Sequence, residues 1–159
     1  MSLLMKGNCF GIKKMSNNIL INSICVKLIF LLASDKKYPF RYADLLYHLA
    51  ISDFYCSDRK FASTSIRNIN SILYYSKNLN QALFKMQSYN LLIIDGELYK
   101  SSYLADCILC QCSDKNSSLY KVKEKMVETH NLCVQSKNVV QTYNELYEKY
   151  LKNKVDGGV

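Results

Sequence analysis

The cysteine and histidine residues are the first candidates for chemistry in this chain of 159 residues. Five of them combine a Cys-x2-Cys-x-Cys motif with a downstream His and Cys: Cys107, Cys110, Cys112, His130 and Cys133. Zinc prefers such ligands, but structural zinc sites usually place their first ligand pair on a turn. Here the pair lies in YLADCILCQC, which is apolar, helical in pattern and free of glycine. The sequence favours reduced thiols over a zinc site, and we expect no metal or other cofactor.

Other catalytic arrangements lack the residues that they need. His130 and Cys133 would be neighbours on a helix, but the sequence pattern provides neither an orienting carboxylate nor an oxyanion hole. Phosphate-binding motifs of the GxxxxGK[ST] and GxGxxG types are absent from the sequence. The carboxylates Glu145 and Glu148 stand among lysines and are typical of solvated ion pairs on a helix. We therefore do not expect an enzyme.

The composition predicts one mostly α-helical domain in a reducing compartment. Apolar residues make up 49% of the chain, enough for a core, and five Gly and one Pro leave few turns. The seven Cys are an odd number, which does not suit a closed disulfide framework. Cys25 and Cys107 lie in apolar surroundings and are predicted to be buried, reduced thiols. A cytoplasmic location follows as the prediction.

The apolar run from Ile19 to Ala33 is predicted to be a helix of a soluble domain. It superficially resembles a signal peptide, but Asn22, Ser23 and Lys27 interrupt it. The run is also too short to span a membrane comfortably, and we expect no membrane partner.

Hydrophobic periodicity predicts the remaining helices and the organisation of the chain. Helices are expected at 19–34, 42–52, about 65–77, 79–88, 103–112 and 118–135, with an apolar stripe continuing to 152. We expect a poorly ordered lead-in at 1–17 and a winged-helix-like core at 18–102. C-terminal helices at 103–152 would pack on this core or on a partner, and 153–159 would form a frayed tail.

The stretch from Asn78 to Ser102 predicts a helix that leads directly into a β-hairpin. Asp95-Gly96 separates LLII from ELYK, and Asp-Gly is typical of a type I′ turn. Strands are expected at 91–94 and 97–100. The predicted fold is mostly α and winged-helix-like, with one short hairpin and a C-terminal helical extension.

Two candidate surfaces follow from this fold. The net charge of +8 favours an acidic partner such as nucleic acid, although it also suits a simply lysine-rich surface. Lysine can contact phosphate, and Asn and Gln can read adenine edges. The nucleic-acid candidates are Arg67, Lys77, Asn80, Gln81, Lys85 and Lys100. The alternative use of the same unit is protein docking. A C-terminal stripe could be core or a docking face for a partner, and comprises Val139, Tyr143, Tyr147 and Tyr150.

The order of elements resembles a known family. The chain opens with NNILINSICVKLIFLLASDKKYPFRYADLLYHLA, continues with SILYYSKNLNQALFKMQSYNLLIIDGELYKSS, and closes with YLADCIL and a helix ending in LYEKYL. Over about residues 17–152 it resembles the small middle component of bacterial ABC three-component, Lamassu-like anti-phage systems. The entry to the hairpin, SYNLLII, departs from the Gly-Leu-Ile type of turn common before wings.

The resemblance implies a non-enzymatic accessory subunit. Such a subunit would dock on an SMC-like ABC ATPase and help to couple double-stranded DNA binding to an effector protein, often a nuclease. Two other functions remain open: a stand-alone winged-helix transcriptional regulator, and a helical adaptor or inhibitor that binds only protein.

Overall fold

A computed structural model describes residues 12–58, 66–110, 114–135 and 137–156. Side chains are described at 19–53, 70–110, 114–135 and, apart from 142 and 146, 141–152. The described part contains six helices and one two-stranded antiparallel sheet. In chain order these are α2 (Ile12–Ser34), α3 (Tyr42–Asp58), α4 (Ile66–Ser88), β1 (Leu92–Asp95), β2 (Leu98–Ser101), α5 (Tyr103–Cys110), α6 (Ser118–Gln135) and α7 (Lys137–Asp156).

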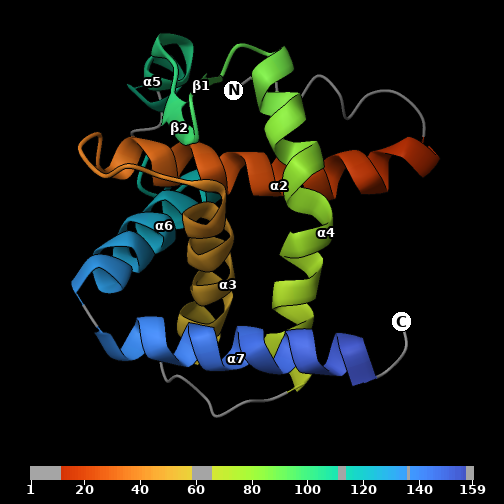
Figure 1. Cartoon of the computed structure of the whole chain (residues 1–159). Coiled ribbons are helices and arrows are strands. Elements are labelled where there is room, and N and C mark those ends of the chain that lie inside the picture. The colour runs from red at the N-terminus through yellow and green to blue at the C-terminus, as the bar shows by residue number, and fades with distance from the viewer. Residues whose placement is uncertain (1–11, 59–65, 111–113, 136, 157–159) are drawn as a thin grey trace.

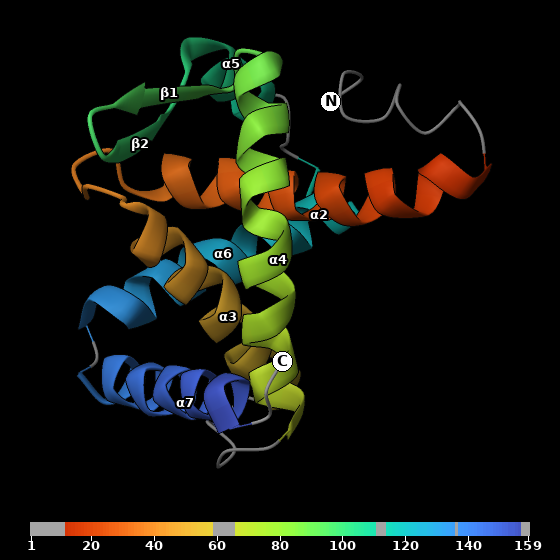
Figure 2. The same ribbon diagram turned by 45° about the vertical axis from the view of Figure 1, so that its right-hand side comes forward.

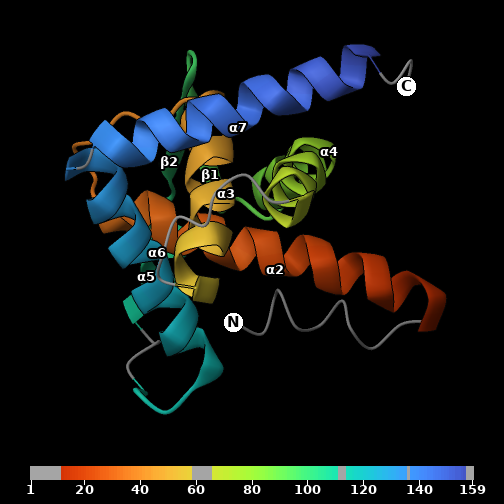
Figure 3. The same cartoon turned by 90° about the horizontal axis from the view of Figure 1, so that it is seen from below.

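Two helices form the centre of the molecule and two others cross them. α3 and α4 lie side by side, with α7 crossing both at one end and α2 crossing at the other end of α3 and partway along α4 (Figure 1). α6 packs against α2 and α3, on the far side of α3 from α4 (Figure 3). The hairpin and α5 lie at the end of α4, beyond α2 (Figure 2). The mostly α prediction is confirmed, together with its single hairpin.

The apolar faces predicted for the first helices form the core. All the predicted inward residues of α2 and α3 are buried: Ile21, Ile24, Cys25, Leu28, Leu31, Leu32, Leu45, Leu46 and Leu49. The main cluster also contains Ala105 of α5 and Met126 of α6. The Cys25 thiol donates to the Ala82 carbonyl oxygen at 3.5 Å, and its burial raises the pKa of Cys25 to about 12. Residues before and after position 102 therefore share one core.

Local polar contacts fix where three helices begin. At α3, the Asp44 carboxylate accepts from the Arg41 backbone N–H at 2.9 Å, as in a capping box. Ser102 caps α5 by accepting from the Ala105 N–H at 3.1 Å. Ser117 caps α6 by accepting from the Tyr120 N–H at 3.1 Å. Each cap pairs a backbone donor that has no partner within its own helix.

The predicted break between two helices near Asn78 is wrong. Residues Ile66–Ser88 form a single helix, α4. The Asn78 side-chain amide donates to the Tyr74 carbonyl oxygen at 2.8 Å within this helix. Leu79 is fully buried and continues the apolar face through this position. Favourable burial on both sides of Asn78 thus outweighs its preference for helix ends.

Other predicted boundaries also shift. The first helix begins at Ile12 rather than Ile19, so part of the predicted lead-in is helical. The helix predicted to end at Ser52 continues to Asp58, and the last helix continues to Asp156. Residues 59–65 and the final residues 157–159 lie outside the described part.

The hairpin turn differs from the predicted Asp95-Gly96 turn. Asp95 pairs with Leu98, which leaves Gly96 and Glu97 as the two loop residues. Gly96 has a φ of +62°, and Glu97 is not among the residues with positive φ. A positive φ at the first loop position alone is the pattern of a type II′ turn. The register is therefore one residue later than predicted, with Leu92 opposite Ser101.

Asn90 ends α4 and sets the direction of the chain into the hairpin. Its φ is 58°, in the left-handed region. The Asn90 N–H donates to the Gln87 carbonyl oxygen at 3.0 Å, and the Leu91 N–H donates to that of Met86 at 2.8 Å. This pair of bonds is a Schellman motif, and the buried Leu91 supplies its apolar contact. Asn90 thus takes the place that glycine usually holds in this motif.

One backbone bridge ties the hairpin to the connection between α2 and α3. The Tyr99 N–H donates to the Phe40 carbonyl oxygen at 2.8 Å, and the two residues form an isolated antiparallel bridge. Phe40 is 1% exposed. The hairpin is therefore held at both ends, by the α4 terminus and by this bridge.

Replacing Asn90 with valine should destabilise the fold. A β-branched residue resists a positive φ, at a cost of about 1–2 kcal/mol in the free energy of unfolding. Asn90→Gly should keep that free energy within about 0.5 kcal/mol. Urea denaturation followed by circular dichroism measures both changes. Asn131→Val on the exposed side of α6 is the matched control; equal losses for both valine variants would contradict the assignment.

Candidate partner interface and buried polar clusters

Three of the predicted nucleic-acid residues share the outer side of α4. Lys77, Asn80 and Gln81 are exposed and lie one helical turn apart along the helix. Phe84 follows on the same side and is 74% exposed. The side of α4 that was predicted to contact nucleic acid therefore has an aromatic ring beside its polar residues. The sequence reasoning missed Phe84, although its place on the polar side of the helical pattern is visible in the sequence.

The other predicted nucleic-acid residues do not join this face. Lys85 is half-buried, and its charge lies close enough to the Cys25 thiol of α2 to lower that thiol's pKa against the larger effect of burial. Lys100 is exposed on β2 and forms an ion pair with Asp95 at 3.3 Å. The side chain of Arg67 lies outside the described residues.

The hairpin adds two exposed apolar side chains. Ile93 is 50% exposed and Ile94 is 44% exposed. Ile93 lies opposite Lys100, so an apolar and a basic side chain share one face of the ribbon. Exposed apolar side chains on a β-ribbon are a feature of surfaces that bind a partner.

The predicted C-terminal stripe lies largely inside the fold. Tyr143 and Tyr150 of α7 are each 8% exposed and belong to a second core cluster with Ile51 and Ile72. Tyr47 of α3 meets Tyr143 edge to face, with 4.8 Å between ring centroids. These two tyrosines therefore take the core alternative within this chain. Tyr147 is half-buried beside both clusters, and the side chain of Val139 is not among those described.

The cysteines divide into buried and accessible groups. Cys133 is 6% exposed, and burial raises the pKa of its thiol to about 12. Cys107 is half-buried and Cys110 is exposed, so burial was wrongly predicted for Cys107. Cys112 lies outside the described residues. Within the described ranges, no three His, Cys, Asp or Glu side chains are grouped as metal ligands would be.

A partly buried polar cluster joins four helices at Asp53 of α3. The Lys27 ammonium group of α2 donates to the Tyr75 hydroxyl at 2.8 Å, and this hydroxyl donates to the Asp53 carboxylate at 3.1 Å. Lys27 and Lys125 of α6 lie 3.8 and 3.7 Å from the same carboxylate oxygen. Tyr75 of α4 is 1% exposed; burial, with Asp53 as the next cause, raises the pKa of its hydroxyl. The hydroxyl therefore keeps its proton and can donate.

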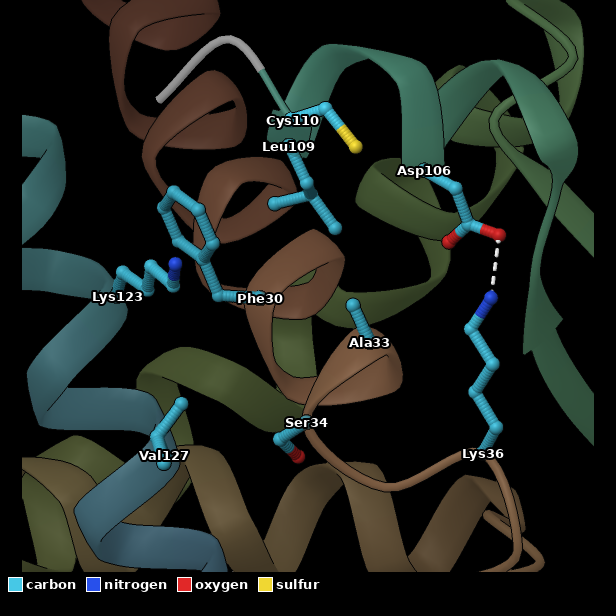
Figure 4. Close-up of a pocket in the computed structure, with 9 residues that line it drawn as sticks. All are labelled: Phe30, Ala33, Ser34, Lys36, Asp106, Leu109, Cys110, Lys123 and Val127. Carbon is cyan, nitrogen blue, oxygen red and sulfur yellow. Dashed lines mark hydrogen bonds and ion pairs between the residues drawn. The ribbon is translucent and has the colours of Figure 1, made fainter. Parts of the chain in front are cut away.

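An open pocket of about 340 Å³ lies between α2, α5 and α6 (Figure 4). Its floor is apolar, with Phe30, Leu109 and Val127. Lys36 closes one side through an ion pair with Asp106 at 2.7 Å. Lys123 of α6 also lines the pocket.

Comparisons of the chain with protein-family models, curated proteins and solved structures find no match. In the described ranges, no helix has the length and apolar character required to cross a bilayer.

Removing the Tyr75 hydroxyl should weaken the Asp53 cluster. Tyr75→Phe keeps the ring but deletes one acceptor and one donor between charged groups, which should lower the free energy of unfolding by about 1.5–3 kcal/mol. Urea denaturation checks this value. Tyr103→Phe is the matched control, because Tyr103 is 82% exposed. A loss no larger than that of the control would show that the cluster contributes little.

Proposed function

We propose that this chain is a non-enzymatic accessory subunit of a DNA-sensing defence complex. It would dock on an SMC-like ATPase and help to couple DNA binding to an effector. The observation that carries the docking step is Phe84, an aromatic ring left 74% exposed on the outer side of α4. Exposed aromatic residues of this kind are typical anchors of protein interfaces.

The surroundings of Phe84 favour a protein surface over the bases of a DNA duplex. Asn80 and Gln81 precede it on the helix, and Ile93 and Ile94 lie exposed on the hairpin that follows. Apolar side chains on both elements suit a partner that buries them, with the amides at the rim. If the Asn80 and Gln81 side chains bound adenine in a DNA groove, Phe84 would lie against polar base edges, which do not suit an aromatic ring.

The element order supports the winged-helix part of the proposal. A winged helix commonly has a short strand between its first two helices that pairs with the wing. Phe40 occupies this position, between α2 and α3, and bridges to Tyr99 of the hairpin. The order helix, bridge, helix, helix, hairpin is thus present in the chain. It also agrees with the resemblance to the middle components of ABC three-component systems.

DNA contact within the complex is the second part of the proposal. Lys77 and Lys100 are exposed, and the whole chain carries a net charge of +8. Scattered lysines bind phosphates without reading sequence, and their contribution falls with salt. The chain would therefore add affinity for DNA to the assembly.

A second function, a stand-alone winged-helix regulator, is favoured by one observation. Lys77, Asn80 and Gln81 are exposed together on the helix that precedes the hairpin. Such a regulator would bind duplex DNA alone and select its sequence. The third alternative, a protein-only adaptor, shares the docking face but predicts no DNA contact.

A charge at Phe84 should abolish docking without unfolding the protein. Phe84→Glu should reduce co-purification with the proposed SMC-like ATPase partner at least tenfold, because a buried, unpaired carboxylate opposes the interface. Tyr103→Glu, at another exposed aromatic residue, should retain the partner. Circular dichroism should show both variants folded. Full retention of the ATPase by Phe84→Glu would refute the proposed docking face.

Charge reversal at the two exposed lysines should weaken DNA binding by the assembled complex. Lys77→Glu with Lys100→Glu should lower the affinity for duplex DNA by about tenfold and flatten its salt dependence. Fluorescence anisotropy at several salt concentrations measures both effects. Lys121→Glu, at an exposed position of α6, is the control. Sequence-selective binding by the isolated chain would instead favour the regulator. Unchanged affinity of the complex would leave the protein-only adaptor.

A further inference from the structure

Two histidines lie stacked in the interior where three segments meet. His48 of α3 is fully buried and His130 of α6 is 2% exposed. Their ring centroids are 5.3 Å apart and the ring planes are 28° from parallel. Tyr38 and Phe40, on the connection between α2 and α3, pack their rings against both histidines. The pair therefore touches the same connection that bridges to the hairpin.

The ring nitrogens form a row of three polar contacts. His48 Nδ1 lies 2.7 Å from the Asp44 carbonyl oxygen. His48 Nε2 lies 3.3 Å from His130 Nδ1. His130 Nε2 lies 3.6 Å from Oδ2 of Asp35, which follows α2. Both ends of the row are acceptors, so each of the three contacts needs one hydrogen from a ring nitrogen.

Counting these hydrogens shows that the neutral pair is one short. Two neutral imidazoles carry one N–H each, which gives two hydrogens for three contacts. One contact must then bring two lone pairs together. A third hydrogen completes the row, whereas a fourth would set two N–H groups against each other between the rings. The geometry therefore suits one added proton.

The distances indicate which contact lacks its hydrogen. The shortest contact, at 2.7 Å, places the His48 hydrogen on Nδ1 toward Asp44. His48 Nε2 is then an acceptor, and the His130 hydrogen lies on Nδ1 between the rings. His130 Nε2 is left without a hydrogen opposite Asp35, at the longest of the three distances, 3.6 Å.

We propose that His48 and His130 form a single proton-binding unit that acts as an acid-sensitive latch. Uptake of one proton at His130 Nε2 creates an ion pair with Asp35. The proton therefore acts where the α2–α3 connection, which carries Phe40 and the hairpin bridge, meets α6. The Asp35 side chain is 41% exposed, so the outer end of the row is open to solvent protons.

The charged and titratable groups around the pair come from the connection, α3, α6 and the hairpin. Besides Asp35 and Asp44, the hydroxyls of Tyr38 and Tyr47 and the thiol of Cys133 surround the pair from the connection, α3 and α6. Lys36 and Lys100 line the small crevice that also contains Asp35.

The two histidines have different electrostatic environments. Burial lowers the pKa of His48 to about 4. Burial also lowers the pKa of His130, but its contact with Asp35 raises it in part. His130 therefore takes up the proton first, at a pH below the ordinary histidine value of about 6.5. Because its pKa is lower in the closed fold than in an exposed ring, this uptake favours release of the connection from α6 as the pH falls.

Nitrogen-15 NMR of the histidine rings on the intact chain tests the latch. In the wild type, His130 Nε2 should take up the first proton as the pH falls. His48 Nδ1 should stay protonated throughout. The amide signals of Phe40 and Tyr99 should shift with the same midpoint. Independent titration of both rings, or titration of His48 before His130, would overturn the proposal.

Asp35→Asn supplies the second measurement. Asparagine keeps the side-chain oxygen that accepts from the Lys37 N–H at 2.9 Å in the native chain, but it removes the charge opposite His130. The proton dissociation constant of His130 should then rise about three- to tenfold, and the Tyr99 shift should move with it. Asp44→Asn is the matched control, because Asp44 contacts the pair through its backbone oxygen. An unchanged His130 midpoint in Asp35→Asn would also overturn the proposal.

Discussion

The arrangement of the helices depends on one carboxylate, that of Asp53. It is approached by two ammonium groups and one hydroxyl, which come from α2, α4 and α6. The Asp53 side chain is 29% exposed, and a carboxylate that is partly withdrawn from water is stabilised when charge and hydrogen bonding compensate it. Three helices must therefore hold their register with α3 for this compensation to persist. The apolar contacts supply most of the driving force, while this cluster selects one relative placement of the four helices.

The sequence was sufficient for the apolar faces and for the presence of the hairpin. The spacing of Leu45, Leu46 and Leu49 identifies a buried face, which the structure confirms. The Asp95-Gly96 pair predicts a turn at those two residues from local preference alone. The strand register instead follows from burial of Leu92 against the core, which moves the turn one residue along. The break at Asn78 failed for a similar reason, since burial of Leu79 overrides a residue that prefers helix ends.

The site residues were harder to predict because they depend on distant packing. His48 and His130 are 82 positions apart in the chain, and no local pattern joins them. Tyr143 and Tyr150 have the spacing of a docking stripe and of a core face alike, and only the position of α3 decides between these. Lys85 lies on the side of α4 that faces α2, whereas Lys77 lies on its outer side. Such assignments require the relative orientation of helices, which periodicity does not contain.

The buried cysteines can report local opening of the core through their reactivity. A thiol with a pKa near 12, as in Cys25 and Cys133, is almost entirely protonated at neutral pH and reacts very slowly with alkylating reagents. Cys25 lies between α2 and α4, and Cys133 belongs to the cluster that α7 covers. Each becomes reactive only when its own helices separate, while exposed Cys110 reacts in the closed protein. The relative alkylation rates of these thiols therefore distinguish which half of the core opens first.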